Sequence, residues 1–441
     1  MKEDLLKKYS GRLSLAESVY EKSHAGDKMD SIKQLTIAKC LDNVNDYLNE
    51  SISSSAATQR SAMGDYKKFC VALTTVALPT LIAFDLVAVS PMSSYTGNVT
   101  YVEYVKGISK GESEADSLVN GVYQLGDVDK NYTGQAVVEP VEAFVSGTTK
   151  IAFTQGAGNV KLLDVDGTQI DKGEATVAED GTVTNTTFID GKTADDVKKI
   201  AYTYDNVVIP QEQLPTLKAT VRNIPLTAHA RRIAVYYSQI AAFQAKTDYG
   251  FNLSDALAEQ AVGQLSYEID TEIIDMLHEA APTAENVKDF DRTLPVGVSM
   301  ADHYASFAAK LEEYKMAIYQ VTKKFTPNFM VVAPDVMPVI SFVPGFQAAS
   351  TTNVVGPYFA GTVSGLKVFV TPNLDANEIF LGVNQGAMQA AAGVYAPYMP
   401  VVPTQLLEYA DGGTSQGWST LYDAKILNAN LLVKGKVKLA S

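Results

Sequence analysis

The stretch VALTTVALPTLIAFDLVAVSPM, residues 71–92, is the most apolar run in the chain, and its length approaches that of a membrane-spanning helix. Two residues inside it oppose a membrane span. Asp85 would place a carboxylate at bilayer depth, which costs at least ~2.5 kcal/mol. Pro79 removes a backbone donor and disfavours helix at Leu78. We therefore predict that the run forms a buried strand or short helix in a large fold and makes no membrane contact.

The composition is that of an ordinary globular protein. The chain has 441 residues, of which 46% are hydrophobic and 20% charged, enough for a sizeable core. The length suggests two to three domains, or one large fold with an insertion. With only Cys40 and Cys70 as cysteines, no disulfide framework is expected, which fits intracellular synthesis. The net charge of -14 argues against a dedicated nucleic-acid-binding protein.

Residues 108–208 differ in character from the rest of the chain. They hold 17 acidic and 8 basic side chains, a net charge of -9. Short β-prone runs such as TKIAFTQ and NVKLLDVDG alternate with Gly, Asp and Asn turn signals. This pattern predicts a small all-β domain inserted into the main fold, and its acidity predicts an exposed location.

The flanking segments combine strands and helices. We expect strands at 99–106 and 328–334, and a long strand over 217–240 that leads into a helix. Apolar residues recur every fourth position over 254–279, which predicts a long helix with one apolar stripe. A further helix is expected from Ser299, with Asp302 completing a capping box, and a short one from Asp335. Strands are predicted for GLKVFVTP, EIFLGVN and ILNANLLVKGKVKL.

The sequence contains no recognisable catalytic, cofactor or metal site. Two cysteines cannot form a zinc site alone, and no histidine has a partner at metal-ligand spacing. The four histidines are His24, His229, His278 and His303. The protein is therefore predicted not to be an enzyme and to need no cofactor.

Several charged and aromatic residues allow two interpretations. Glu268 and Glu272 could act as paired carboxylates, but an acidic helix face is preferred. Arg231 and Arg232 fit interfacial ion pairs or a solvated helix start. Trp418 could anchor an interface, although core packing is preferred.

At LPTLIAFDLVAVSPMSSYTGNV, residues 78–99, the sequence resembles the major capsid proteins of tailed phages of the T-even type (Caudoviricetes). Further resemblances follow in the same order along the chain. They are AVYYSQIAAFQAKTDYG (234–250, a helix before the spine helix), EQAVGQLSYEIDTEIIDML (259–277, the spine helix), NFMVVAPDVMPVI (328–340), GPYFAGTVSGLKVFVTP (356–372), GVYAPYMPV (393–401) and GWSTLYD (417–423).

The resemblance covers about 71–107 and 210–435. The 108–208 segment shows no match, the N-terminal segment matches poorly, and Leu421 and Asp423 replace the family's Arg and Gly. The family-matched motif residues are Pro79, Ile82, Phe84, Asp85, Pro91, Met92, Gly97, Gly361, Gly365, Tyr395, Pro397, Tyr398 and Trp418. Relatives are trimmed after a small-hydrophobic-x-Glu pattern, which Glu17 and Glu50 fit as candidate processing sites.

The resemblance implies an α+β fold of the Hong Kong 97 type with an inserted small all-β domain. The implied parts are an N-terminal arm (1–70), a core segment and first strand of an extended hairpin loop (71–107), the acidic insertion (108–208), the return strand of that loop (209–230), a peripheral domain with the spine helix (231–330), an axial domain (331–415) and C-terminal strands (416–441).

The implied function is that of a major capsid protein. It would self-assemble through heterologous contacts into hexamers of an icosahedral or prolate shell. The shell would enclose double-stranded DNA without sequence-specific binding and would be assembled in the host cytoplasm into the virion. A vertex protein, scaffold, portal and decoration proteins are candidate partners. An encapsulin-like cellular shell protein and a secreted β-rich adhesin remain as alternatives.

Overall fold

The protein is described here by a computed structural model. Cys70, the start of the apolar run (71–74) and the side chain of Glu50 lie outside the described residues. The residues described are 2–24, 27–53, 75–119, 131–185, 187–207, 210–250, 252–283, 287–349, 356–404, 407–410 and 412–438.

The chain divides into two compact units. The first comprises Met1–Val99 and Asn223–Ser441, and the second comprises Thr100–Arg222. In the first unit the helices are α1 (Lys2–Lys8), α2 (Ser10–Ser23), α3 (Ser31–Ser53), α5 (Ala83–Leu86), α6 (Gln239–Asp248), α7 (Leu253–Ala280), α8 (Met300–Ala305), α9 (Phe307–Thr322) and α10 (Met337–Ser341).

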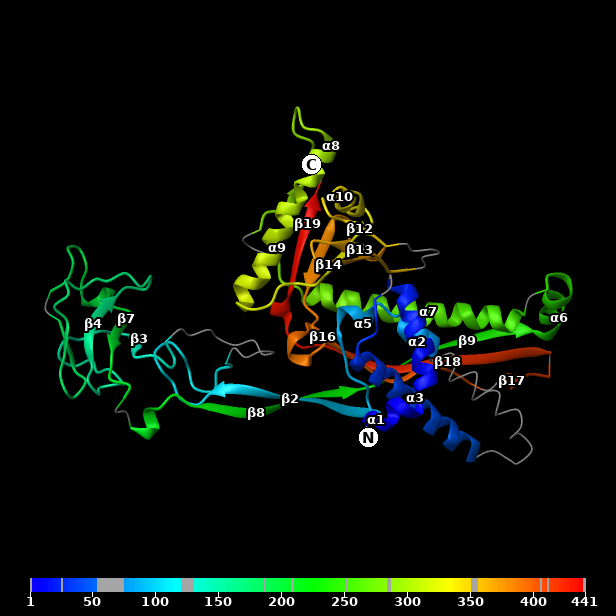
Figure 1. Cartoon of the computed structure of the whole chain (residues 1–441), viewed down its shortest axis with the longest axis horizontal. Coiled ribbons are helices and arrows are strands. Elements are labelled where there is room, and N and C mark those ends of the chain that lie inside the picture. The colour runs from blue at the N-terminus through cyan, green and yellow to red at the C-terminus, as the bar shows by residue number, and fades with distance from the viewer. Residues whose placement is uncertain are drawn as a thin grey trace. The chain divides into compact units, whose positions relative to one another are not determined.

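A five-stranded sheet lies beside α7 in the first unit (Figure 1). Its strands are β1 (Ala88–Val89), β16 (Gly393–Pro403), β18 (Gly413–Ile426), β17 (Leu407–Glu408) and β9 (His229–Ser238), which pairs with β18. The buried face of α7 carries Leu265, Ile269, Ile273 and Leu277 at a spacing of four residues. The predicted helix over 254–279 and its apolar stripe are therefore confirmed.

A seven-stranded mixed sheet forms the other layer of the first unit. In spatial order it contains β10 (Phe290–Asp291), β19 (Leu432–Lys438), β15 (Glu378–Gly382), β11 (Phe329–Val332), β14 (Leu366–Val370), β13 (Tyr358–Val363) and β12 (Gln347–Ala348). Helix α9 packs against β19 through its buried face, which includes Phe307, Leu311 and Ile318. The strands predicted at 328–334, in GLKVFVTP and in EIFLGVN are confirmed.

The hairpin between β13 and β14 depends on two glycines. Gly361 has a φ of +149°, and a Cβ there would lie 2.1 Å from the carbonyl oxygen of Gln347. Gly365 follows Ser364 in the turn, and both have positive φ values, +79° and +47°. A side chain is therefore blocked sterically at Gly361, whereas at Gly365 only the backbone conformation favours glycine.

The two units are joined along the chain by the strands of a two-stranded sheet. Its strands are β2 (Thr96–Lys106) and β8 (Leu217–Thr227). Several of its apolar side chains are exposed, among them Val102, Tyr104, Leu217 and Val221. An isolated pair of strands is marginally stable at best in water.

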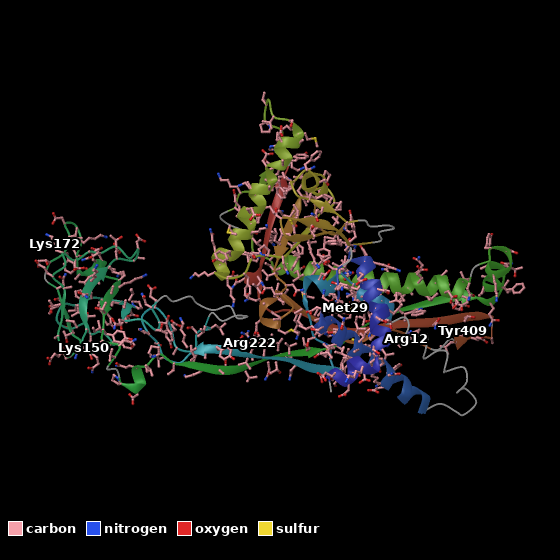
Figure 2. All side chains as sticks on the ribbon, viewed as in Figure 1. Arg12, Met29, Lys150, Lys172, Arg222 and Tyr409 are labelled. Atoms are coloured by element: carbon pink, nitrogen blue, oxygen red, sulfur yellow. The ribbon has the colours of Figure 1, made fainter. Side chains whose placement is uncertain are left out.

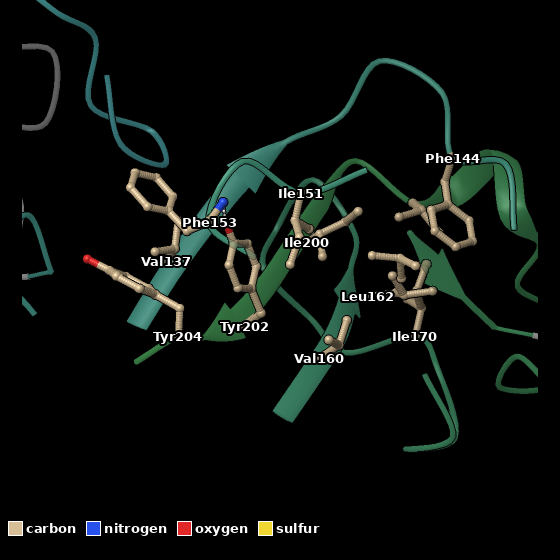
Figure 3. Close-up of a cluster of buried hydrophobic side chains, with 12 residues drawn as sticks. Val137, Phe144, Ile151, Phe153, Val160, Leu162, Ile170, Ile200, Tyr202 and Tyr204 are labelled. Atoms are coloured by element: carbon tan, nitrogen blue, oxygen red, sulfur yellow. Dashed lines mark hydrogen bonds between the residues drawn. The ribbon is translucent and has the colours of Figure 1, made fainter. Parts of the chain in front are cut away.

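The second unit has its own core (Figure 3). Its strands are β3 (Ala136–Pro140), β4 (Gly158–Leu163), β5 (Thr176–Val177), β6 (Val183–Thr184) and β7 (Lys199–Thr203). Strands β3, β7 and β4 form one sheet, and β5 pairs with β6. Leu162, Ile170 and Ile200 are fully buried at its centre.

Three predicted elements differ in their bounds. The strand predicted over 217–240 is confirmed as β8 and β9, whereas the helix that the family resemblance implied from Ala234 begins only at Gln239, because Ala234–Ser238 pairs with β18. The helix predicted from Ser299 is interrupted at Ser306. The cap itself is present, because Ser299 Oγ accepts the backbone N–H of Asp302 at 3.2 Å. The helix expected from Asp335 begins at Met337.

Candidate functional site

The apolar run lies at the junction between the layers of the first unit. Leu78–Thr80 forms a 3-10 turn, Ala83–Leu86 a short helix and Ala88–Val89 a strand, so the prediction of a buried strand or short helix is confirmed. Among the helices of the described residues, none is both long and apolar enough to cross a bilayer.

The run is positioned by the motif GVYAPYMPV. Strand β1 runs parallel to β16, with Val89 paired to Tyr395. The backbone N–H groups of Ser90 and Met92 donate to the carbonyl oxygens of Tyr395 and Pro397, each at 3.0 Å. The rings of Phe84 and Tyr395 meet edge to face, 6.2 Å apart. Two segments that carry the family resemblance, far apart in sequence, therefore lie side by side.

Asp85 lies at the centre of a buried charge cluster. Its Oδ1 accepts hydrogen bonds from the Tyr20 hydroxyl and the Lys33 ammonium, each at 2.7 Å. His24 Nε2 lies 3.2 Å from its Oδ2, and Lys367 Nζ lies 3.6 Å from its Oδ1. Tyr20 lies in α2 and His24 at its end, while Lys33 lies in α3 and Lys367 in β14.

The cluster keeps Asp85 ionised although it is buried. Burial alone would raise its pKa, but Lys33, His24 and Lys367 together outweigh burial and lower the pKa to about 2. Burial lowers the pKa of His24 despite the nearby carboxylate, and burial also raises the pKa of the Tyr20 hydroxyl. Because removing one partner of a buried ion pair costs roughly 3–5 kcal/mol, this junction depends on all its members being present.

A second buried carboxylate, Asp270 of α7, holds the same run from another side. It accepts the backbone N–H of Ala83 at 3.0 Å and that of Ile82 at 3.3 Å, which caps the short helix α5. Burial raises the pKa of Asp270 to about 7. Asp270 was not among the residues predicted from the sequence, although its position next to Ile269, on the apolar face of the predicted helix, was the available signal.

Asn384 ties the seven-stranded sheet to the same run. Its Nδ2 donates to the carbonyl oxygens of Asp85 at 2.9 Å and Val87 at 3.0 Å. Its own backbone N–H donates to Asn328 Oδ1 at 2.8 Å. A cavity of about 270 Å³ lies beside these groups, lined in part by Lys33, Asp85 and Asn384.

Arg231 forms an internal ion-pair network instead of starting a helix. Its NH1 lies 2.9 Å from Glu268 Oε2 and its NH2 2.6 Å from Glu272 Oε2, while its Nε donates to the Tyr422 hydroxyl at 2.6 Å. Burial opposes the charge of Arg231, but Glu272 and Tyr422 raise its pKa above the ordinary value. Of the two interpretations given for Arg231 and Arg232, the helix start is wrong because both residues lie within β9, whereas Arg231 does form ion pairs, within one subunit. The two glutamates bind one cation and join α7 to β9 and β18.

The other predicted residues lie at separate places. Trp418 is 2% exposed and packs against α7 beside Ala261 and Leu265. Pro79, Ile82 and Met92 are buried in or beside the run, Pro91 and Tyr398 are half-buried, and Gly97 is in β2. Gly361 and Gly365 are in the β13–β14 hairpin.

Glu17 lies within α2, next to the fully buried Ala16. The described residues contain no group of three histidine, cysteine or acidic side chains that could hold a metal ion.

The sequence model of the family described as "Major capsid protein Gp23" matches residues 63–438 of the chain. The chain belongs to the Gp23 family of major capsid proteins. The predicted function, that of a phage major capsid protein, is thereby confirmed, and the encapsulin-like and adhesin alternatives are disfavoured. The family is one of structural proteins.

Individual relatives of this capsid protein are distant. The major capsid protein of Vibrio phage KVP40 is 22% identical over 392 residues, which cover 79% of this chain and 74% of the relative. That of Enterobacteria phage T4 is 21% identical over 400 residues, covering 78% and 72%.

Among solved structures, the capsid of Myoviridae phage XM1 matches 66% of this chain and 90% of its own, with 9% identity and a TM-score of 0.35. The SrpI encapsulin of Synechococcus elongatus matches 52% and 82%, with 13% identity and the same TM-score.

Proposed function

We propose that this capsid protein has the Hong Kong 97-type fold and assembles head to tail into hexamers of an icosahedral or prolate shell around double-stranded DNA. The observation that carries the proposal is the family match over 63–438, which spans both units. Assembly takes place in the host cytoplasm, and the shell becomes part of the virion. Scaffold, portal, vertex and decoration proteins are the proposed partners.

The two-stranded sheet of β2 and β8 serves as the extended loop. Val102 and Tyr104 share one face of β2, and Leu217 and Val221 share one face of β8, because side chains alternate along a strand. All four are more than two-fifths exposed within the single chain. A neighbouring subunit that covers these side chains supplies the packing that two strands alone do not have.

We assign the five-stranded sheet with α6 and α7 to the peripheral domain, and the seven-stranded sheet with α8, α9 and α10 to the axial domain. This proposed division follows the sheets and differs from the boundaries expected from the resemblance, 231–330 and 331–415. Strand β16 pairs with β18, which in turn pairs with β9, so β16 and β9 belong to one sheet, whereas α9 packs on β19 of the other. The segment Lys2–Ser53 is the N-terminal arm, and Glu17 and Glu50 are candidate processing sites.

The proposal is tested by expressing the full chain alone and with a phage scaffold, followed by sedimentation and negative-stain electron microscopy. Closed shells, tubes or hexamers are expected. The matched variants are Val221→Asp and Val165→Asp, since the two valines are 63% and 62% exposed and Val165 lies outside the extended loop. We expect only Val221→Asp to abolish assembly. A wild-type chain that stays monomeric with scaffold present would contradict the proposal.

A further inference from the structure

We propose that the body of the subunit, from Thr75 onward, contains a binding site for the helical segment Lys2–Ser53 of the same chain, with Asp85 as its recognition group. The ligand is a helical hairpin that presents a tyrosine hydroxyl and a lysine ammonium together. The segment therefore remains bound when the chain between Ser53 and Thr75 is cut. This inference concerns one subunit and does not rest on shell assembly.

The first anchor of the segment is the Asp85 cluster. Tyr20 and Lys33 both bind Asp85 Oδ1, and Lys33 Nζ also lies 2.7 Å from the Tyr20 hydroxyl. The Tyr20 ring is stacked on that of His24, with centroids 4.0 Å apart. The two donors thus contact each other within the hairpin as well as the carboxylate, which favours their joint placement. A ligand that is preorganised in this way loses little conformational entropy on binding.

The second anchor lies on α3, ten residues further along the hairpin. Asn43 Nδ2 donates to the carbonyl oxygens of Met92 and Tyr398, each at 2.8 Å. These carbonyls belong to the end of the apolar run and to β16, so one amide spans both segments. Between the two anchors, Ile37, Cys40 and Leu41 are fully buried, and α3 lies against β16 and β1. Met29, in the connection between α2 and α3, is also buried (Figure 2).

The charges of the two partners complement each other. Without the segment, Lys367, at 3.6 Å, is the one cation that the described residues of the body offer to Asp85. The segment contributes Lys33 to Asp85 and, in exchange, Asp27 to Lys367 at 2.6 Å. A buried carboxylate with too few partners is costly, so the body favours a ligand that supplies a cation and a hydroxyl at this point.

The site has a consequence for the proposed processing. Cleavage after Glu50 would leave Tyr20, Lys33 and Asn43 together on one N-terminal piece, with both anchors intact. Cutting the chain therefore does not by itself uncover the run at Leu78–Met92. A second event that disrupts the Asp85 cluster is needed to remove the hairpin.

The experiment places a recognition sequence for a specific protease between Ser53 and Thr75 of the full-length chain. After complete cutting of the unassembled protein, gel filtration and dilution series measure how tightly the N-terminal piece is held. For the wild-type sequence we expect the two pieces to elute together at micromolar concentration. Asp85→Asn is expected to weaken the affinity by about 30-fold or more, because Lys33 loses its carboxylate.

Two further variants separate recognition from folding. Asp423→Asn is the matched control, since Asp423 is a buried carboxylate of the body that accepts the Thr227 N–H at 2.8 Å and pairs with Lys425, and both partners belong to the body. It should hold the piece as the wild type does. Lys33→Met alters the ligand and leaves the sequence of the body unchanged, so it tests the contact even if Asp85→Asn fails to fold. Immediate separation of the wild-type pieces, or equal affinity in Asp85→Asn, Lys33→Met and Asp423→Asn, would overturn the proposal.

Discussion

Replacement of Asp270 by asparagine should change how the stability of the subunit depends on pH. The carboxyl group of Asp270 has its pKa raised by burial to about 7, compared with 3.8 for an ordinary aspartate. Between these values the folded state holds a proton that the unfolded state has released. The free energy of unfolding therefore falls as pH rises through this window, and the contribution of Asp270 is constant above about pH 7.

The size of the effect follows from the width of the window. Between pH 5 and pH 8 the full effect is that of the two pH units from 5 to the pKa of about 7, which at ~1.36 kcal/mol per unit amounts to about 2.7 kcal/mol. Asparagine does not titrate, so its variant lacks this slope. It has a pH-independent cost of about 1 kcal/mol instead, because only its oxygen can accept one of the two N–H groups that Asp270 holds.

The assay is urea unfolding of the unassembled subunit at pH 5 and pH 8, followed by the fluorescence of Trp418. This is the only tryptophan in the chain and packs against α7, which carries Asp270. The difference in unfolding free energy between wild type and Asp270→Asn should favour the wild type more at pH 5 than at pH 8. Contributions from His24 and Asp85 are common to both proteins and cancel. A difference that stays constant with pH, or grows toward pH 8, would refute the assignment.

Three further predictions concern other parts of the fold. Gly361→Ala should destabilise the β13–β14 hairpin by about 3 kcal/mol and Gly365→Ala by only ~1 kcal/mol, because only the Cβ added at Gly361 would clash with a backbone oxygen. Hydrogen exchange of the hairpin amides compares the two variants. Arg231→Met should cost about 1 kcal/mol at low salt, given the partial exposure of its partners, and Arg231→Lys less; a loss insensitive to salt would contradict the ion pairs. Lys110→Met should lower the unfolding free energy of the second unit by about 3 kcal/mol, because Lys110 is buried and donates to three backbone carbonyls. Lys150 forms an exposed ion pair, so Lys150→Met should change that free energy by less than ~0.5 kcal/mol; thermal melts compare the two variants.

The helices and strands were predictable where the pattern is local. The apolar stripe of α7 repeats every four residues, and the cap of α8 lies in four consecutive positions, so both could be read from the chain. For Ala234–Ser238 two predictions conflicted, the strand over 217–240 and the helix implied by the family resemblance, because its apolar residues fit a helix as well as a strand. The segment is extended only because β18, almost two hundred residues away, offers a partner.

The candidate site was only partly visible in the sequence. Asp85 was recognised as a residue that excludes a membrane span and as part of a family motif, but its partners were not. Tyr20 and Lys33 lie 65 and 52 residues before it, and no spacing rule connects such positions. Their hydrogen bonds exist because α2 and α3 fold back over the run, which is a property of tertiary packing.

The two buried carboxylates, Asp85 and Asp270, each fix a different part of the apolar run. Apolar side chains alone would bury the run but leave its position along the sheet and helix weakly specified, since hydrophobic contacts are not directional. Asp270 fixes the backbone of Ile82 and Ala83 through two hydrogen bonds, and Asp85 fixes the side of the run that meets the N-terminal helices. Asn384, which follows strand β15, connects the seven-stranded sheet to the run by donating to the carbonyl oxygens of Asp85 and Val87. Helix α7, the N-terminal helices and the seven-stranded sheet are thus each bonded to the same few residues. A shift of the run would break buried polar contacts, a cost that apolar packing alone would not impose.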